Sequence, residues 1–180
     1  IMQQYGVSKP VFLNETGFMC AETVAGEPAE WCVPPGDAFF EMQADFAVRT
    51  FVRGMSEDVM GFIWYTLNGP GWRHTGMFNS DQTPRPVYTA YQTLNNQLKG
   101  TTYAAPAEHG IWVEGYIFTS RTRLVQVLWS RNDATHVVSI PAETFIAAYD
   151  RENNPITPTL SGNYYQLQVQ FAPIYVLLHP

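Results

Sequence analysis

The sequence KPVFLNETG, residues 9–17, is an apolar run that ends in polar residues and a glycine. Such a run is typical of a buried β-strand, and here its C-terminal end carries Asn14 and Glu15. A second run, VMGFIWYTL at residues 59–67, is apolar on both faces. Strands with two apolar faces are typical of parallel sheets that helices cover. We therefore predict two buried parallel strands, with a carboxylate at the end of the first.

Helical patterns follow both strands. Asp37 is a candidate N-cap for a helix that runs to about Met55, over which apolar residues recur at helical spacing. Pro86 suits the first turn of a second helix, and Gly100 suits its end. The order strand, helix, strand, helix in residues 1–100 predicts an α/β architecture with parallel strands.

The pattern changes after Gly100. Residues 101–109 are linker-like, and the remainder alternates strand signals with turn signals. Period-two alternation with frequent turns predicts an antiparallel sheet or sandwich. The predicted fold class is thus α/β followed by all-β, with the first domain over 1–100 and a β-sandwich domain over 101–180. The expected strands of the second domain are residues 111–119, 124–129, 136–140, 145–149, 164–171 and 174–178.

Charge and composition exclude several classes of partner. The 180 residues include 10 Lys and Arg against 16 Asp and Glu, for a formal net charge of −6. Without a basic patch, neither nucleic acid nor an anionic membrane is an expected partner. No apolar run reaches the roughly 18 residues that cross a bilayer. The sequence has no glycine-rich phosphate loop and no cysteine with zinc-ligand spacing, so we expect no cofactor and no metal.

The two cysteines, Cys20 and Cys32, lie in one loop-like segment rich in glycine and proline. A disulfide between them would close a small loop, and would imply an oxidising, extracytoplasmic compartment. Two free thiols are the alternative, because a sequence does not supply the geometry that a bridge requires.

The motifs at the two strand ends resemble those of the clan A superfamily of retaining glycoside hydrolases, which have (β/α)8 barrels. The sequence KPVFLNETG is similar to the seventh-strand motif, in which the Glu near the strand end is the nucleophile. The sequence GFIWYTL, residues 61–67, is similar to the eighth strand, whose Trp floors the sugar subsite. This resemblance implies that Glu15 is the catalytic nucleophile and that Trp64 contacts the substrate.

The resemblance continues along the chain. GMF at residues 76–78 and PRPVYTAY at residues 84–91 are similar to the approach into the last barrel helix. APIYV, residues 172–176, is similar to the C-terminal β-sandwich that several of these families carry. The family thus implies a partial barrel, its last two βα units, followed by an antiparallel sandwich.

The chemistry of such a site requires aromatic and polar side chains near the carboxylate. Aromatic faces stack on the C–H surfaces of sugars, so Trp64 and Trp72 are candidate platforms. Asn68, His74 and Tyr65 could supply polar contacts to hydroxyl groups, or could stabilise their loop by hydrogen bonds instead.

One departure from the family bears on activity. A retaining glycosidase needs two carboxyl groups about 5–5.5 Å apart. In the family the second one follows an Asn at the end of the fourth strand, and no such pair lies upstream of Glu15. A whole barrel takes roughly 200–250 residues. We therefore expect the C-terminal part of a glycoside hydrolase that is inactive alone, although the intact protein would hydrolyse O-glycosidic bonds.

Two further expectations follow. Unpaired edges on both parallel strands predict self-association, or pairing with the missing N-terminal barrel segment. The alternative function is a non-catalytic, carbohydrate-binding or structural β-sandwich module in which the partial barrel is idle. Carbohydrate is the expected partner of a glycoside hydrolase, and also of a carbohydrate-binding module.

Overall fold

The computed structural model of the protein describes residues 3–7, 9–20 and 35–180. The helices predicted from Asp37 and from Pro86 are both present, and so is each of the two predicted N-terminal strands. The first part of the chain contains η1 (Gln3–Tyr5), β1 (Val11–Thr16), α1 (Asp37–Ser56), β2 (Val59–Trp64), η2 (Trp72–His74) and α2 (Pro86–Leu98).

The rest of the chain, which we call the strand-rich half, forms antiparallel sheets as predicted. One sheet has the strand order β3-β4-β5-β10-β7, and the other has the order β6-β9-β8. The strands are β3 (Thr102–Pro106), β4 (Val113–Thr119), β5 (Leu124–Ser130), β6 (His136–Pro141), β7 (Phe145–Asp150), β8 (Thr159–Ser161), β9 (Tyr164–Val169) and β10 (Ile174–Leu178).

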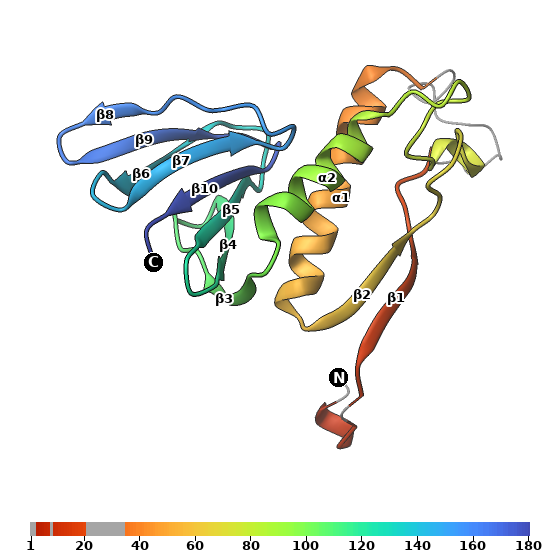
Figure 1. The fold of residues 1–180 in the computed structure, drawn as a ribbon, viewed down its shortest axis with the longest axis horizontal. Helices are drawn as coiled ribbons and strands as arrows, with labels where there is room; N and C mark the ends of the chain where they lie inside the picture. Colours follow the sequence, from red (N-terminus) through yellow and green to blue (C-terminus); the bar gives the residue numbers. More distant parts are fainter. Residues whose placement is uncertain (1–2, 8, 21–34) are drawn as a thin grey trace.

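The strands β1 and β2 form a separate two-stranded parallel sheet, the strand pair. Figure 1 shows α1 and α2 between this pair and the strand-rich half. The carboxyl ends of both strands therefore meet at one edge of the molecule, beside η2.

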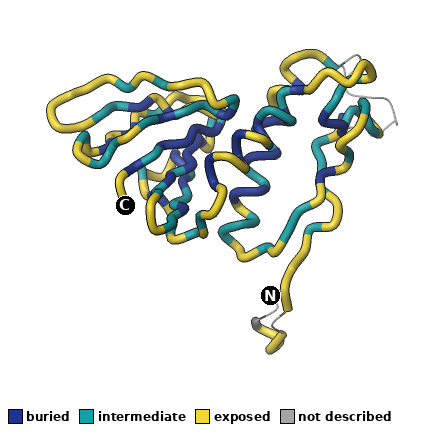
Figure 2. The backbone as a smooth tube through the Cα atoms, viewed as in Figure 1, coloured by how far each residue is buried: buried dark blue, intermediate teal, exposed yellow. Residues whose placement is uncertain are grey.

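The prediction that both strands are buried on two faces is wrong. Phe12 on β1 and Met60 and Ile63 on β2 are exposed, and Figure 2 shows exposed and half-buried backbone along most of the pair. Both helices pack against the same face of the pair, so the opposite face has no cover among the described residues.

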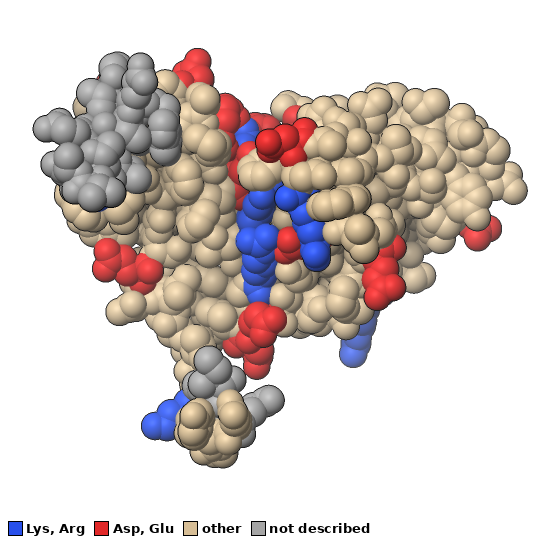
Figure 3. Space-filling model, turned by 180° about the vertical axis from the view of Figure 1, so that it is seen from behind, with Lys and Arg blue, Asp and Glu red and all other residues tan. Residues whose placement is uncertain are grey.

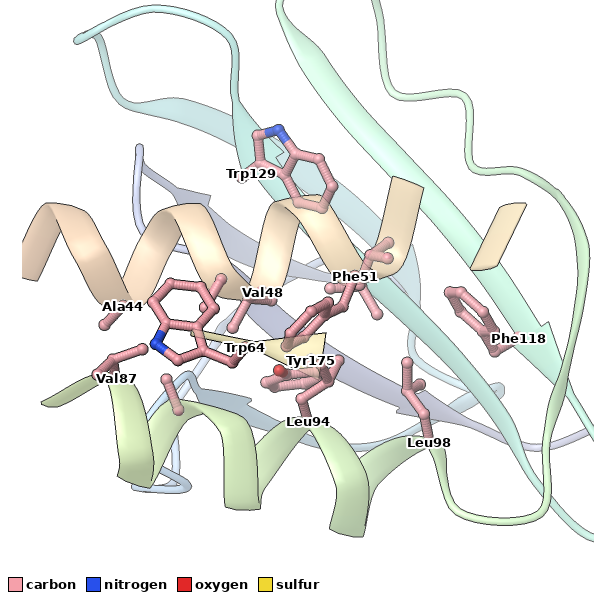
Figure 4. Packing of buried hydrophobic residues seen from close by; sticks show 14 of the residues in the cluster. Ala44, Val48, Phe51, Trp64, Val87, Leu94, Leu98, Phe118, Trp129 and Tyr175 are labelled. Carbon is pink, nitrogen blue, oxygen red and sulfur yellow. The ribbon is translucent and has the colours of Figure 1, made fainter. Parts of the chain in front are cut away.

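An apolar cluster crosses from the helices to the five-stranded sheet (Figure 4). Phe51 of α1 and Leu94 of α2 are buried in it together with Trp129 and Tyr175 of the sheet. A second cluster fills the space between the two antiparallel sheets, with Leu128 from one and Leu167 from the other. The helices and the strand-rich half therefore share a continuous core.

Charged side chains line the seam between α1 and the strand-rich half. Arg53 donates from Nε and from a terminal nitrogen to the two carboxylate oxygens of Glu114, at 2.7 and 2.8 Å. Arg151, after β7, contacts the carboxylates of Glu41 and Asp45 on α1. Figure 3 shows basic side chains gathered in the middle of one face, with acidic ones beside them. None of the helices in the described residues has the length and hydropathy to cross a bilayer.

Candidate functional site

The carboxyl ends of β1 and β2 border a hollow of about 470 Å³. Glu15 lies at the end of β1 and is exposed there. The N–H of Tyr65 donates to the carbonyl of Thr16 at 2.7 Å, which holds the end of β1 against β2. The described lining consists of Glu15, Thr16, Gly17, Met19, Tyr65, Trp72 and Thr75.

Gly17 allows the chain to leave β1 close to β2. A Cβ atom at this position would lie 2.8 Å from the carbonyl oxygen of Tyr65, closer than such atoms approach each other. The glycine that ends the motif KPVFLNETG thus keeps Glu15 beside the second strand. Of the side chains that line the hollow, Glu15 is the only carboxylate among the described residues.

Two aromatic rings border the hollow beside this carboxylate. Tyr65 is 43% exposed and Trp72 is 58% exposed. The guanidinium carbon of Arg73 lies 5.0 Å from the Trp72 ring centroid, over its face. Exposed ring faces next to a carboxylate and open to solvent can stack on a sugar while the carboxylate reaches its polar edge.

Trp64, which the sequence resemblance assigns to substrate contact, is not part of the described lining of the hollow. It is 8% exposed, its indole N–H donates to the carbonyl of Thr75 at 2.8 Å, and it packs against Phe46 and Phe51 of α1 (Figure 4). Because successive side chains of a strand point to opposite faces, Trp64 points to the helices. The ring that reaches the hollow is that of the next residue, Tyr65.

The other predicted contact residues lie near the hollow without lining it. Asn68 is exposed in the loop after β2, and His74 is half-buried at the end of η2. Burial lowers the pKa of His74, and the positive charge of Arg85 lowers it further. The structure thus groups Glu15 with Trp72, and leaves Asn68 and His74 outside the described lining.

Gln43, which no motif in the sequence marks, positions two loops beside the hollow. Its side chain is fully buried on α1, and its Nε2 donates to the carbonyls of Phe18 and His74, at 3.0 Å each. Phe18 follows β1 and His74 ends η2, so one amide ties together the two loops that border the hollow. The sequence does contain a pattern that could have identified Gln43. It lies four residues after Phe39 and four before Ala47, so it is a polar residue in an otherwise apolar stripe of the helix.

Arg85 holds the loop between β2 and α2 from within. It is almost fully buried, and one terminal nitrogen donates to the carbonyls of His74 and Gly76, at 3.0 and 2.9 Å. Its Nε donates to the side-chain oxygen of Asn79 at 2.9 Å. Burial lowers the pKa of Arg85. The loop that carries Trp72 is therefore fixed through its backbone.

The cysteine prediction falls partly outside the described residues. Cys20 is buried, and its N–H donates to the carbonyl of Arg73 at 3.0 Å, next to the hollow. Cys32 lies outside the described residues, so the pairing of the two stays a prediction. In the described part of the chain no three His, Cys, Asp or Glu side chains group as metal ligands would.

Comparison with known proteins finds likeness in structure. No family model and no curated protein sequence matches the chain. A family 39 glycoside hydrolase from the gut symbiont Bacteroides cellulosilyticus WH2 matches with a TM-score of 0.70 at 18% identity, over 95% of this chain and 34% of that one. A family 30 endoxylanase from Clostridium papyrosolvens C71 matches with a TM-score of 0.60 at 13% identity, over 99% of this chain and 44% of that one.

A third match is the catalytic domain of the family 30 xylanase C from Talaromyces cellulolyticus. Its TM-score is 0.65 at 12% identity, over 97% of this chain and 41% of that one. Identities this low establish a shared fold. Nearly the whole chain is covered, yet it spans less than half the length of each of these structures. The resemblance to clan A glycoside hydrolases is thus confirmed for the fold, in an arrangement consistent with their C-terminal part.

Proposed function

We propose that the chain is the C-terminal part of a retaining glycoside hydrolase in which Glu15 is the nucleophile. The observation that carries this proposal is the position of Glu15 at the carboxyl end of β1, in a hollow that Tyr65 and Trp72 also line. The carboxyl ends of barrel strands are where enzymes of this architecture hold their catalytic groups. The fold likeness to glycoside hydrolases supports the same reading.

In this mechanism the Glu15 carboxylate attacks the anomeric carbon, and the glycosidic bond to the leaving oxygen breaks. A general acid protonates that oxygen, and water then cleaves the glycosyl-enzyme ester with net retention. The described lining of the hollow supplies the nucleophile but no second carboxyl group. The acid/base must therefore come from another segment, and the chain alone is inactive in turnover.

The substrate is a carbohydrate. Tyr65 and Trp72 form the platform on which its rings stack, and Asn68, exposed in the same loop, supplies a polar contact. Two of the structurally similar proteins are xylanases, so a xylan backbone is the first substrate to test.

The partner completes the sheet. Within the described residues β1 pairs only with β2, and β2 only with β1, so each strand presents one unpaired edge. Unpaired edges are templates for pairing with further strands. The N-terminal segment of a barrel, or further copies of this chain, can occupy them.

A mechanism-based covalent inhibitor that needs no general acid tests whether Glu15 is the nucleophile. The probe is 2,4-dinitrophenyl 2-deoxy-2-fluoro-β-xylobioside, whose leaving group departs without protonation and whose fluorine slows hydrolysis of the ester. We expect a slow, stoichiometric mass increase on the peptide that contains residues 9–17, and none in Glu15→Gln. An adduct at another carboxylate, or no adduct at millimolar probe, contradicts the proposal and favours the non-catalytic alternative.

A further inference from the structure

The strand-rich half has a hollow of its own, about 510 Å³ in volume. It lies where the turn between β6 and β7 meets the hairpin between β8 and β9. Figure 1 places this hairpin at the opposite end of the molecule from η2 and the Glu15 hollow. The lining consists of Pro141, Ala142, Glu143, Leu160, Gly162, Asn163 and Tyr164.

Both apolar and polar side chains line this hollow. Tyr164 is 49% exposed, and the side chain of Leu160 is also exposed. Across the described part of the chain, no hydrogen bond or ion pair engages the Glu143 carboxylate, the Asn163 side-chain amide or the Tyr164 hydroxyl. An accessible ring beside unengaged acceptors and donors suits a ligand that has C–H faces and hydroxyl edges.

The backbone around the hollow is well fixed. The N–H of Ala142 donates to the carbonyl of Asn163 at 2.9 Å, which joins the two turns. Thr144 donates from its N–H to the carbonyl of Pro141 at 3.1 Å. Gly162 has a φ of 58°, a conformation that favours glycine in a tight hairpin. The lining side chains therefore stand on a preformed frame, which lowers the entropic cost of binding a ligand.

The adjoining face of the three-stranded sheet carries no charge. The strands β6, β8 and β9 contain no Asp, Glu, Lys or Arg. Tyr164, Gln166 and Gln168 share one face of β9, whereas Leu167 and Val169 are buried on the other. The hydroxyl of Ser139 donates to Gln166 Oε1 at 3.0 Å. Tyr164 thus belongs both to the hollow and to a strip of neutral polar side chains.

We infer that this hollow and the neutral strip beside it bind an uncharged oligosaccharide or polysaccharide, with Tyr164 as the stacking platform. An acidic glycan is disfavoured, because the described lining of this hollow carries the Glu143 carboxylate and no Lys or Arg that would offset its charge. The site is independent of Glu15. A polymer held here would be retained at the end of the molecule remote from the Glu15 hollow.

Affinity electrophoresis of the 180-residue chain in native gels tests this inference. The gels contain arabinoxylan, hydroxyethylcellulose or pullulan as neutral probes, and polygalacturonate as the acidic one. We expect at least one neutral polymer to retard the protein, and polygalacturonate not to. Replacement of Tyr164 by Ala is expected to weaken the binding about tenfold, a loss of about 1.4 kcal/mol.

Matched variants separate this site from others. Trp112→Ala removes an aromatic side chain that is 53% exposed elsewhere on the strand-rich half, and should leave retardation unchanged. Tyr164→Ala is also compared with wild type in a Trp72→Ala background, which removes a platform of the Glu15 hollow, so the outcome does not depend on the proposed hydrolytic role. If Tyr164→Ala does not fold, Glu143→Ala in the exposed turn provides the test, with weaker retardation expected. Absence of retardation by all three neutral polymers, or retardation that survives these variants at the hollow, overturns the inference.

Discussion

Asp45 is a buried carboxyl group on α1 that shares one guanidinium with two other carboxylates. Arg151 contacts Asp45, Glu41 and Glu152, and it also donates to the backbone carbonyl of Glu41 at 2.7 Å. Burial raises the pKa of Asp45 from 3.8 to about 7; the charge of Arg49 opposes this rise, and Glu152 adds to it. A guanidinium divided among three carboxylates compensates each one only in part, so burial dominates.

This raised pKa predicts a pH-dependent stability. Between about pH 4 and pH 7 the folded protein binds a proton at Asp45 that the unfolded chain releases, so the contribution of this group to stability falls as pH rises. We expect urea denaturation at pH 5 and pH 8 to give different stability gaps between wild type and Asp45→Asn. The unfolding free energy of the wild type, relative to that of Asp45→Asn, should be lower at pH 8 than at pH 5. Asp133→Asn, at an exposed position, is the control. Parallel pH profiles for wild type and Asp45→Asn would contradict this account.

Tyr65 lines the hollow and Trp64 does not. The sequence does not indicate which of these two neighbouring side chains points to the hollow. The sequence GFIWYTL is apolar at almost every position, so alternation gives no phase from which to tell the inner face from the outer. Glu15 and Trp72 both line the hollow. Their positions, at a strand end and in the following loop, do not depend on that phase. Gln43 and Arg85 act through backbone carbonyls, which no side-chain motif records.

At the scale of elements, α1 positions both loops of the candidate site through Gln43. Replacing this residue with Leu removes two hydrogen bonds. The carbonyl of Phe18 loses its Gln43 donor, whereas the carbonyl of His74 still accepts from Arg85. An unsatisfied buried polar group costs about 1–3 kcal/mol. We expect Gln43→Leu to lower the unfolding free energy by about 2 kcal/mol in urea denaturation.

The control for this prediction is Gln92→Leu on α2. Gln92 is exposed, and its Nε2 donates only to the neighbouring Tyr88 hydroxyl, at 3.1 Å. An exposed substitution of this kind changes stability by about 0.5 kcal/mol or less. Similar losses for the two variants would show that the tie between the loops is not what Gln43 contributes.

The elements that the sequence predicted are those with strong periodic signals. Both helices and the strands around residues 124–129 and 174–178 agree closely with the structure. The missed strands are β3, predicted as a linker, and β8. β8 has three residues, and β3 forms the edge of its sheet and ends in Pro106. Short strands and edge strands form because a neighbouring strand pairs with them, and their own sequences carry little periodic signal.

The uncovered face of the strand pair predicts self-association of the isolated chain. Phe12 and Ile63 are exposed on strands whose outer edges have no pairing partner in the described residues. Burial of such surface is favourable by roughly 25 cal/mol per Å². We expect light scattering to give a mass above the 20.4 kDa of one chain.

A charge on this face should restore the monomer. Ile63→Glu is the test variant, and Val137→Glu, at an exposed position on β6, is its control. A monomeric wild-type chain at tens of micromolar contradicts self-association and leaves an N-terminal barrel segment as the proposed partner. Association that persists equally in both variants would place the contact elsewhere.

The anchoring of the site loops on main-chain oxygens affects how this scaffold can diversify. Gln43 and Arg85 contact the loops at carbonyls that every amino acid possesses. The path of the loop after β2 therefore depends little on its exposed side chains, Trp72 included, and more on a few fixed positions such as Asn79, whose side chain accepts from Arg85. Ligand preference can drift, or be re-engineered, by exchanging those side chains one at a time while the frame beneath them is inherited unchanged.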